Sequence, residues 1–172
     1  MVRAMFPGTF DPIHFGHIDI ATRASRIFDE VVIAVYDKPL KNLLFSPEER
    51  LSLVRTSFSG SPKVKVIGYS GLTVNFARQE DVNVIIRGLR VFSDFEFEFR
   101  MALANHRLAA EVETVALITN EEHTFISSTT VREIALLGGD VTSMVPAHVH
   151  DALKKKIASL EDPIPQANSL RD

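Results

Sequence analysis

The sequence predicts an α/β protein: a single-domain, doubly wound (Rossmann-like), five-stranded parallel sheet with helices on both faces. Two observations predict this class. Short apolar runs alternate with helical patterns along most of the 172 residues, which is typical of a parallel sheet whose strands are connected by helices. A turn marked by glycine and proline follows the first apolar run, and α/β proteins hold phosphates at such turns.

Five segments are predicted strands because each is short, apolar and bounded by polar or turn-forming residues. The clearest is residues 31–36 (VVIAVY), which is rich in β-branched side chains. The five predicted strands are residues 2–6, 31–36, 64–67, 82–86 and 114–118. We expect the fourth to end at Arg87 and Gly88.

Helical patterns fill the intervals between these strands. Ser46 suits an N-cap, Pro47 suits the first helical position and Glu49 completes a capping box, so a helix is expected to open there. Gly138 and Gly139 mark a helix end. The other predicted helices are residues 18–28, 72–79, 94–108, 129–137 and 147–157.

The domain organisation is expected to be simple. The chain contains no internal repeat, and its length suits one domain with a sizeable core. We therefore expect one domain over residues 1–158. Residues 159–172 carry Pro163 and Pro165 and few apolar side chains, so a flexible C-terminal tail is expected.

Composition excludes several classes of function. The absence of cysteine excludes disulfides, zinc–thiolate sites and thiol nucleophiles. We expect no signal peptide, since the first apolar run leads directly into the turn. No apolar stretch approaches the roughly 20 residues that span a bilayer. A net charge of −3 disfavours general nucleic-acid binding. A cytoplasmic protein is expected.

The segment of residues 6–17 (PheProGlyThrPheAspProIleHisPheGlyHis) is the most informative motif. It joins the first predicted strand to the first predicted helix. There the helix dipole and free N–H groups favour an anion, and imidazole nitrogens can donate to phosphate oxygens. A bare pair of His14 and His17 is weaker evidence, because lone histidines are often structural and no third metal ligand lies nearby in the sequence.

Polar side chains gather at the predicted strand ends. In parallel sheets these ends share one edge, where ligands bind. The residues concerned are Thr9, His17, Asp37, Lys38, Lys41, Arg87, Arg90, Ser127, Ser128, Thr129 and Arg132. A basic cluster in an acidic protein suggests an anionic substrate. Alternatives remain: Lys38 and Lys41 can be simply solvated, and Ser127 can be only an N-cap.

Other nucleotide and hydrolase chemistries are disfavoured. The sequence lacks G-x-x-x-x-G-K-[ST], G-x-G-x-x-G and G-x-S-x-G, which argues against P-loop hydrolysis, dinucleotide redox chemistry and a serine hydrolase. Glu96 and Glu98 could suggest a glycosidase pair, but residues two apart on a helix point to different sides.

Three blocks of sequence together resemble bacterial phosphopantetheine adenylyltransferases, which belong to the HxGH-type nucleotidyltransferase superfamily. The blocks are PGTFDP with GHID at residues 7–19, RGLR with DFEFE at 87–98, and FISST with GDV at 125–141. The resemblance runs from about residue 3 to residue 157. The second block discriminates this family from other nucleotidyltransferases, which share the first and third.

The resemblance implies an activity. The family transfers the adenylyl group of ATP to 4′-phosphopantetheine with Mg²⁺, giving dephospho-CoA and pyrophosphate in coenzyme A synthesis. It implies a homohexamer in which coenzyme A can occupy the site, and no nucleic-acid or membrane partner. We expect direct in-line attack, since the acceptor phosphate is already a nucleophile and positioning plus charge stabilisation can suffice.

The resemblance also implies residue roles. His17, Thr9, Lys41 and Arg90 would be catalytic, and Thr9, Lys41, Thr73 and Arg87 would bind phosphopantetheine. The residues implied for ATP are Thr9, Phe10, His17, Gly88, Leu89, Arg90, Glu98, His123, Thr124, Phe125, Ile126, Ser127, Ser128 and Thr129. No protein ligand to a metal is implied, so Mg²⁺ would be held mainly by ATP phosphates and water.

Some residues depart from the family pattern. His14 stands where threonine is common, Thr73 where the residue is often apolar, Phe97 where tyrosine is common and Thr129 where serine is common. Two competing functions follow. A nicotinate-mononucleotide-type adenylyltransferase is favoured slightly by His14 and opposed by the second block. A non-catalytic nucleotide-sensing domain is opposed by the presence together of His17, Lys41, Arg87 and Arg90.

Overall fold

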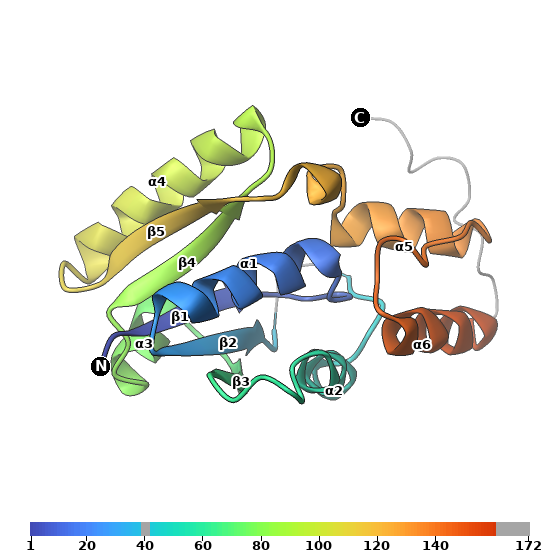
Figure 1. Ribbon diagram of the computed structural model, residues 1–172, viewed down its shortest axis with the longest axis horizontal. Helices are drawn as coiled ribbons and strands as arrows, with labels where there is room; N and C mark the ends of the chain where they lie inside the picture. The colour runs from blue at the N-terminus through green and yellow to red at the C-terminus, as the bar shows by residue number, and fades with distance from the viewer. Residues whose placement is uncertain (39–41, 161–172) are drawn as a thin grey trace.

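The sheet is all-parallel and covered by helices on both faces, which confirms the predicted fold class. A computed structural model describes residues 1–38 and 42–160. Within these residues five strands lie in the order β3-β2-β1-β4-β5 (Figure 1). The strands are β1 Arg3–Gly8, β2 Glu30–Tyr36, β3 Val64–Tyr69, β4 Val84–Leu89 and β5 Glu113–Ile118. The α-helices are α1 Phe15–Ile27, α2 Pro47–Ser57, α3 Thr73–Gln79, α4 Phe92–Leu108, α5 Ser128–Leu136 and α6 Ala147–Ala158.

The two central strands separate halfway along their length. β1 pairs with β2 over its whole length, from Arg3 to Gly8. It pairs with β4 only at Ala4 and Met5. An opening therefore forms between the carboxyl-terminal halves of β1 and β4. This is the switch point of a doubly wound sheet, where the chain turns to opposite edges and where ligands bind.

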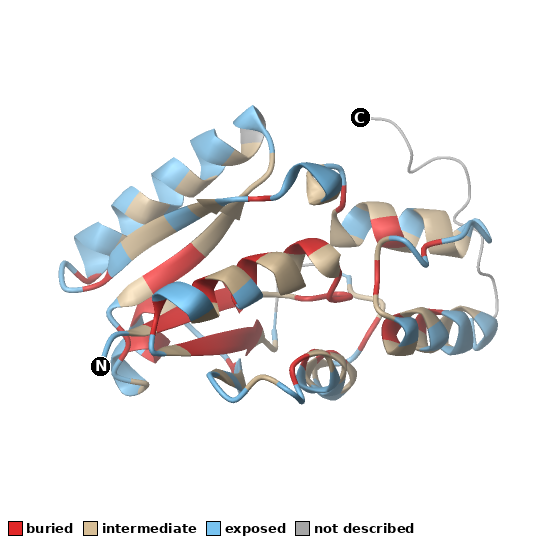
Figure 2. Ribbon diagram, viewed as in Figure 1, coloured by how far each residue is buried: buried red, intermediate tan, exposed pale blue. Residues whose placement is uncertain are grey.

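Two hydrophobic cores lie on opposite faces of the sheet. Alternation along β1 sends Ala4 and Phe6 to one core and Met5 to the other. The first core is closed by α1, α2, α5 and α6, and the second by α3 and the segment after α4. Burial concentrates on β1, β2 and the inner side of α1 (Figure 2).

Local sequence signals explain several helix ends. Ser46 caps α2 as predicted: its hydroxyl accepts the Glu49 N–H, and the Glu49 carboxylate accepts the Ser46 N–H. Gly138 follows the end of α5 with a φ of 78°, a left-handed conformation that glycine adopts without steric cost.

Several boundaries differ from the predictions by a few residues, and two of them bear on the site. β4 continues to Leu89, so Arg87 lies inside the strand and does not follow it. α1 begins at Phe15, because His14 takes the extended N-cap conformation, and this places His17 in the first turn. A short 3₁₀ helix, Glu121–His123, was not predicted. Among the described residues, no helix is both long and apolar enough to cross a membrane.

Candidate active site

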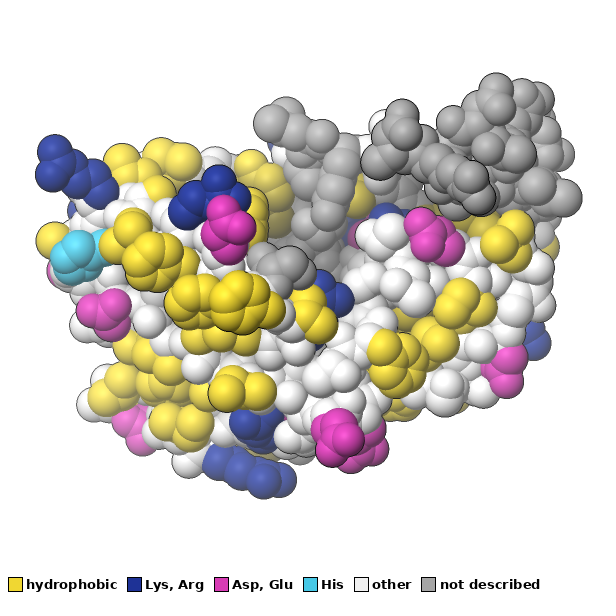
Figure 3. Space-filling view, turned by 90° about the horizontal axis from the view of Figure 1, so that it is seen from above, with side chains coloured by type: hydrophobic (Ala, Val, Ile, Leu, Met, Phe, Trp, Pro, Cys, Tyr) yellow, Lys and Arg dark blue, Asp and Glu magenta, His cyan; other side chains and the backbone are white. Residues whose placement is uncertain are grey.

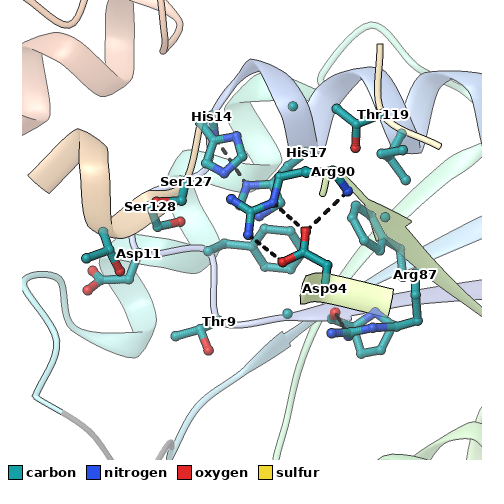
Figure 4. A pocket seen from close by; sticks show the side chains of 18 of the residues that line it. Thr9, Asp11, His14, His17, Arg87, Arg90, Asp94, Thr119, Ser127 and Ser128 are labelled. Atoms are coloured by element: carbon teal, nitrogen blue, oxygen red, sulfur yellow. Dashed lines mark hydrogen bonds and ion pairs between the residues drawn. The ribbon is translucent and has the colours of Figure 1, made fainter. Parts of the chain in front are cut away.

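A cavity of about 330 Å³ lies at the carboxyl ends of β1 and β4, where those strands separate (Figure 4). The β1–α1 turn, β4 and the start of α5 all contribute to its wall. A second cavity of about 420 Å³ adjoins it. Both cavities are lined by Pro7, Gly8, Thr9, Arg87 and Glu98, so these residues mark the place where the two meet.

His14 and His17 form a stacked pair at the start of α1. Their ring centroids lie 3.7 Å apart, with 24° between the planes. Gly16 makes room for this arrangement, because a Cβ atom there would lie 3.0 Å from the His14 ring. The His14 backbone N–H donates to His17 Nδ1 over 3.3 Å. A neutral His17 that accepts at Nδ1 carries its proton on Nε2, which leaves Nε2 as a donor.

Burial and neighbouring cations keep both imidazoles neutral. Burial, with smaller contributions from the neighbouring Arg90 and His123, lowers the pKa of His14 to about 3. Burial also holds the pKa of His17 well below its usual range, followed in effect by His14, Arg90 and Arg87. At neutral pH the pair therefore presents uncharged hydrogen-bonding groups.

Each arginine that lines the first cavity is held by a carboxylate. Arg87 makes two hydrogen bonds of 2.7 Å to Glu98 and one of 3.0 Å to the Pro7 carbonyl. The planar guanidinium thus connects β4, α4 and β1 in a bidentate geometry.

Arg90 is held in the same way. Its Nε and Nη2 atoms donate to Asp94 over 3.0 and 3.1 Å, and Nη1 donates to the Ile126 carbonyl over 2.9 Å. Arg132 donates to the Asp11 carbonyl and lies 3.4 Å from the Asp11 carboxylate. These contacts orient the cations before any ligand arrives.

The start of α5 supplies a further anion-binding element. The Ser127 hydroxyl accepts the Thr130 N–H over 3.0 Å, so the N-cap interpretation is confirmed. Ser128 donates its hydroxyl to the Pro12 carbonyl over 2.9 Å, which joins α5 to the β1–α1 turn. The cap satisfies one N–H, so other N–H groups of the first turn remain able to donate hydrogen bonds to an anion.

The second cavity is more apolar in character. Tyr36, Tyr69, Leu72 and Thr73 line one side, and the α4 face with Phe97, Met101 and Leu108 lines another. The Tyr69 and Thr73 hydroxyls lie 3.0 Å apart. Such a surface suits an extended molecule with an aliphatic part and a few polar groups.

Comparisons with known proteins agree with this geometry. Residues 5–134 match the family model described as Cytidylyltransferase-like. The chain is 52% identical over 155 residues to the phosphopantetheine adenylyltransferase of Roseiflexus castenholzii, covering 90% of this chain and 97% of that protein. The proteins of the same name from Herpetosiphon aurantiacus and Methylococcus capsulatus are 48% and 50% identical, covering 94% and 91% of this chain and 98% and 97% of theirs.

The chain belongs to the phosphopantetheine adenylyltransferase family. It is therefore an enzyme of the nucleotidyltransferase class. The expected family membership and enzyme class are confirmed by these identities over most of the chain.

Most of the residues that the sequence singled out come together. Those that line the first cavity are Thr9, Phe10, His17, Arg87, Gly88, Arg90, Glu98, Ser127, Ser128 and Thr129. Thr73 lines the second cavity. Lys41 lies outside the described residues.

Five of the predicted ATP residues do not line either cavity: Leu89, His123, Thr124, Phe125 and Ile126. Ile126 is fully buried in the first core, and its carbonyl holds Arg90. His123 keeps its Nδ1 buried, with no hydrogen-bond partner among the described residues. Phe125 is 60% exposed. In this structure the segment from His123 to Ile126 therefore lines neither cavity.

Several residues that line the first cavity were not predicted from the sequence. Asp11, Asp94 and Thr119 were given no role, and Arg132 was noted only by its position. Asp94, in the first turn of α4, lies four residues after Arg90, a separation short enough to have indicated an ion pair. Thr119 directly follows β5, at the sheet edge where ligands bind.

Proposed function

We propose that this protein transfers the adenylyl group of ATP to 4′-phosphopantetheine, giving dephospho-CoA and pyrophosphate. The observation that carries the proposal is the pair of adjoining cavities that meet at Thr9 and Arg87. One is lined by phosphate-binding groups and the other by a largely apolar surface. The names of the similar proteins support the same reaction.

ATP would occupy the first cavity. The starts of α1 and α5 both border it, so two helix dipoles favour the triphosphate. Arg90 and the segment Ser127–Ser128–Thr129 would bind phosphate oxygens, with Ser128 and Thr129 nearest the β- and γ-phosphates. Gly88 would allow close approach of the nucleoside to β4.

Phosphopantetheine would place its phosphate at the junction and its arm in the second cavity. Arg87 would bind this phosphate, and a hydrogen bond to the phosphate would replace one of its two hydrogen bonds to Glu98. Thr73 and the apolar side of α4 would line the path of the arm. Lys41, which the family resemblance assigns to the same phosphate, would assist Thr9.

The chemistry would be a single displacement. A phosphate oxygen of phosphopantetheine attacks the α-phosphorus, and the bond to the β-phosphate oxygen breaks in line with it. Pyrophosphate departs with the electron pair of that bond. His17 Nε2–H would donate to the α-phosphate oxygens as negative charge develops there, and no covalent intermediate on the protein is needed.

Mg²⁺ would be held mainly by the phosphates of ATP and by water. The carboxylates of Asp11, Asp94 and Glu98 are each paired with an arginine. Within the described residues, no group of three His, Asp or Glu side chains could hold a metal ion. The ion would neutralise triphosphate charge.

A homohexamer is proposed from the exposed face of α4. Phe92, Phe95, Phe99 and Leu103 lie three or four residues apart and are each at least half exposed. Figure 3, viewed from above, shows hydrophobic side chains gathered over the half of the molecule where α4 lies. Contact between copies would cover this face.

Two further proposals follow from the family. Coenzyme A, which contains the product of the proposed reaction, would bind in the same site, and a cytoplasmic location would suit a step of coenzyme A synthesis.

The test is pyrophosphate release with ATP, Mg²⁺ and a candidate acceptor. We expect release with 4′-phosphopantetheine and little with nicotinate mononucleotide, because the second cavity suits a long arm and not a flat ring. His17→Ala serves as a control that assigns the activity to this chain. Preferential use of nicotinate mononucleotide would show that phosphopantetheine is the wrong acceptor. No pyrophosphate release with either acceptor would favour a nucleotide-sensing domain.

A further inference from the structure

Arg50 is a fully buried cation that lines neither cavity. It lies on α2, is 0% exposed, and forms no ion pair within the described part of the chain. Its guanidinium instead holds three backbone carbonyls. Nη1 donates to Thr9 over 2.7 Å and to Tyr36 over 2.6 Å, and Nη2 donates to Asp37 over 3.2 Å. One side chain thus fastens the end of β2 to the β1–α1 turn.

The Thr9 carbonyl that Arg50 holds directly precedes a residue with an unusual backbone conformation. Phe10 has a φ of 52°, in the left-handed region that bulky side chains rarely adopt. The φ angle of Phe10 describes rotation about its N–Cα bond, which begins at the peptide between Thr9 and Phe10. The Thr9 carbonyl is part of that peptide, so a hydrogen bond to this carbonyl helps to fix the orientation of the peptide plane. Further along the chain, Arg132 holds the Asp11 carbonyl, which belongs to the peptide between Asp11 and Pro12. Arginine contacts therefore hold the chain on both sides of this strained residue.

The Phe10 ring lies in an edge-type contact with the His17 ring. Its centroid lies 4.9 Å from that of His17 at 68°, and 5.7 Å from that of Phe6 at 85°. The ring is 2% exposed and lies against Gly8, where a Cβ atom would approach it to 3.0 Å. Thr9, whose peptide Arg50 fixes, lines both cavities.

We propose that Arg50 is a positioning residue for adenylyl transfer, acting through the Thr9 carbonyl and the Phe10 ring on His17. This proposal rests on the proposed function. A buried arginine with only a structural task would affect folding stability and leave the turnover of folded enzyme unchanged. A positioning role instead predicts a loss of kcat, because misplacement of a catalytic group by about 1 Å can reduce the rate by about 10²-fold.

The experiment compares R50M and R50K with R55M, which alters an exposed arginine on the same helix. Steady-state kcat and KM are measured at a temperature where circular dichroism shows each variant folded. We expect R50M to lose about 10²-fold in kcat with little change in KM for ATP. R50K, which can restore one or two of the carbonyl contacts, should lie between R50M and the wild type, and R55M should match the wild type.

F10A provides the second line of the test. Because Arg50 acts through Phe10, R50M should reduce kcat much less in an F10A background than in the wild type. Wild-type kcat in a folded R50M, or in F10A, would overturn the proposal, as would simple additivity. If R50M does not fold, kcat is compared in folded R50K and F10A, and wild-type kcat in both of these variants would likewise overturn the proposal. Failure of the wild type to release pyrophosphate would instead contradict the proposed function.

Discussion

At the residue scale, the site relies on two histidines that are held neutral and in contact. Burial explains the lowered pKa values, and the His14 N–H explains why the donor of His17 is Nε2. A neutral donor costs less to bury than a cation. It can still stabilise charge that develops only during the reaction.

His17→Ala should reduce kcat far more than it weakens ATP binding. A donor aimed at developing charge is worth about 10²–10³ in rate. His14→Ala should cost much less, since His14 contributes its stacked ring and a backbone N–H that alanine retains. Pyrophosphate-release kinetics and ATP titration measure the two effects. Equal losses of kcat in both variants would show that the roles within the motif are wrongly divided.

His14→Thr should flatten the dependence of stability on pH. The pKa of His14 is about 3 when folded and about 6.5 in an unfolded chain. Between these values the unfolded state binds more protons, so stability falls as pH decreases through that window. Urea unfolding at pH 7 and pH 5 measures the difference. An unaltered pH dependence in His14→Thr would contradict the lowered pKa.

At the element scale, the separation of β1 from β4 creates the site. Arg87, on β4, spans the opening between these strands through its hydrogen bond to the Pro7 carbonyl on β1.

Arg87→Ala should raise KM for phosphopantetheine more than KM for ATP, because the variant removes a charge-assisted contact to one substrate. Steady-state kinetics with each substrate varied in turn measures both constants. The control is Arg78→Ala, because Arg78 is a surface arginine paired with Glu111. This variant should change neither KM. A larger rise in KM for ATP would assign Arg87 to the nucleotide.

Sequence predicted well those elements that depend on local signals. The Ser46 capping box and the glycine stop after α5 rest on neighbours a few residues apart, and both are confirmed. The end of β4 was misplaced because pairing with β5 extends the strand through Gly88 to Leu89. The Arg87–Glu98 and Arg50–Thr9 contacts join separate elements, so no local pattern indicated them.

At the scale of the whole molecule, the strand order places the candidate residues at one edge of the sheet. Alternation of strands and helices predicted the doubly wound class, but β1–β4 adjacency is a property of the folded chain. The exposed apolar face of α4 is the other large-scale feature, and it lies on the helix that also lines the second cavity. In the proposed function, assembly and acceptor binding would therefore share α4.

Phe95→Glu should disrupt the proposed hexamer. Phe95 is half exposed and stacks on Phe99 with centroids 5.8 Å apart. A charge there would be buried without a partner in the assembly. Light scattering after size exclusion should show the wild type well above the 19.2 kDa of one chain and the variant smaller. Ile27→Glu, on α1 and 63% exposed, should leave the assembly unchanged. A monomeric wild type would contradict the proposal.

In the proposed reaction, the adenylyl group passes directly between two ligands bound in adjoining cavities. The stereochemical course of the reaction shows whether it does. ATP with a chiral α-thiophosphate would be converted with phosphopantetheine, and the configuration of the product determined by ³¹P NMR. A single in-line displacement predicts inversion at phosphorus. Retention would require two displacements, and hence a covalent adenylyl intermediate on the protein, which would contradict the proposed single displacement.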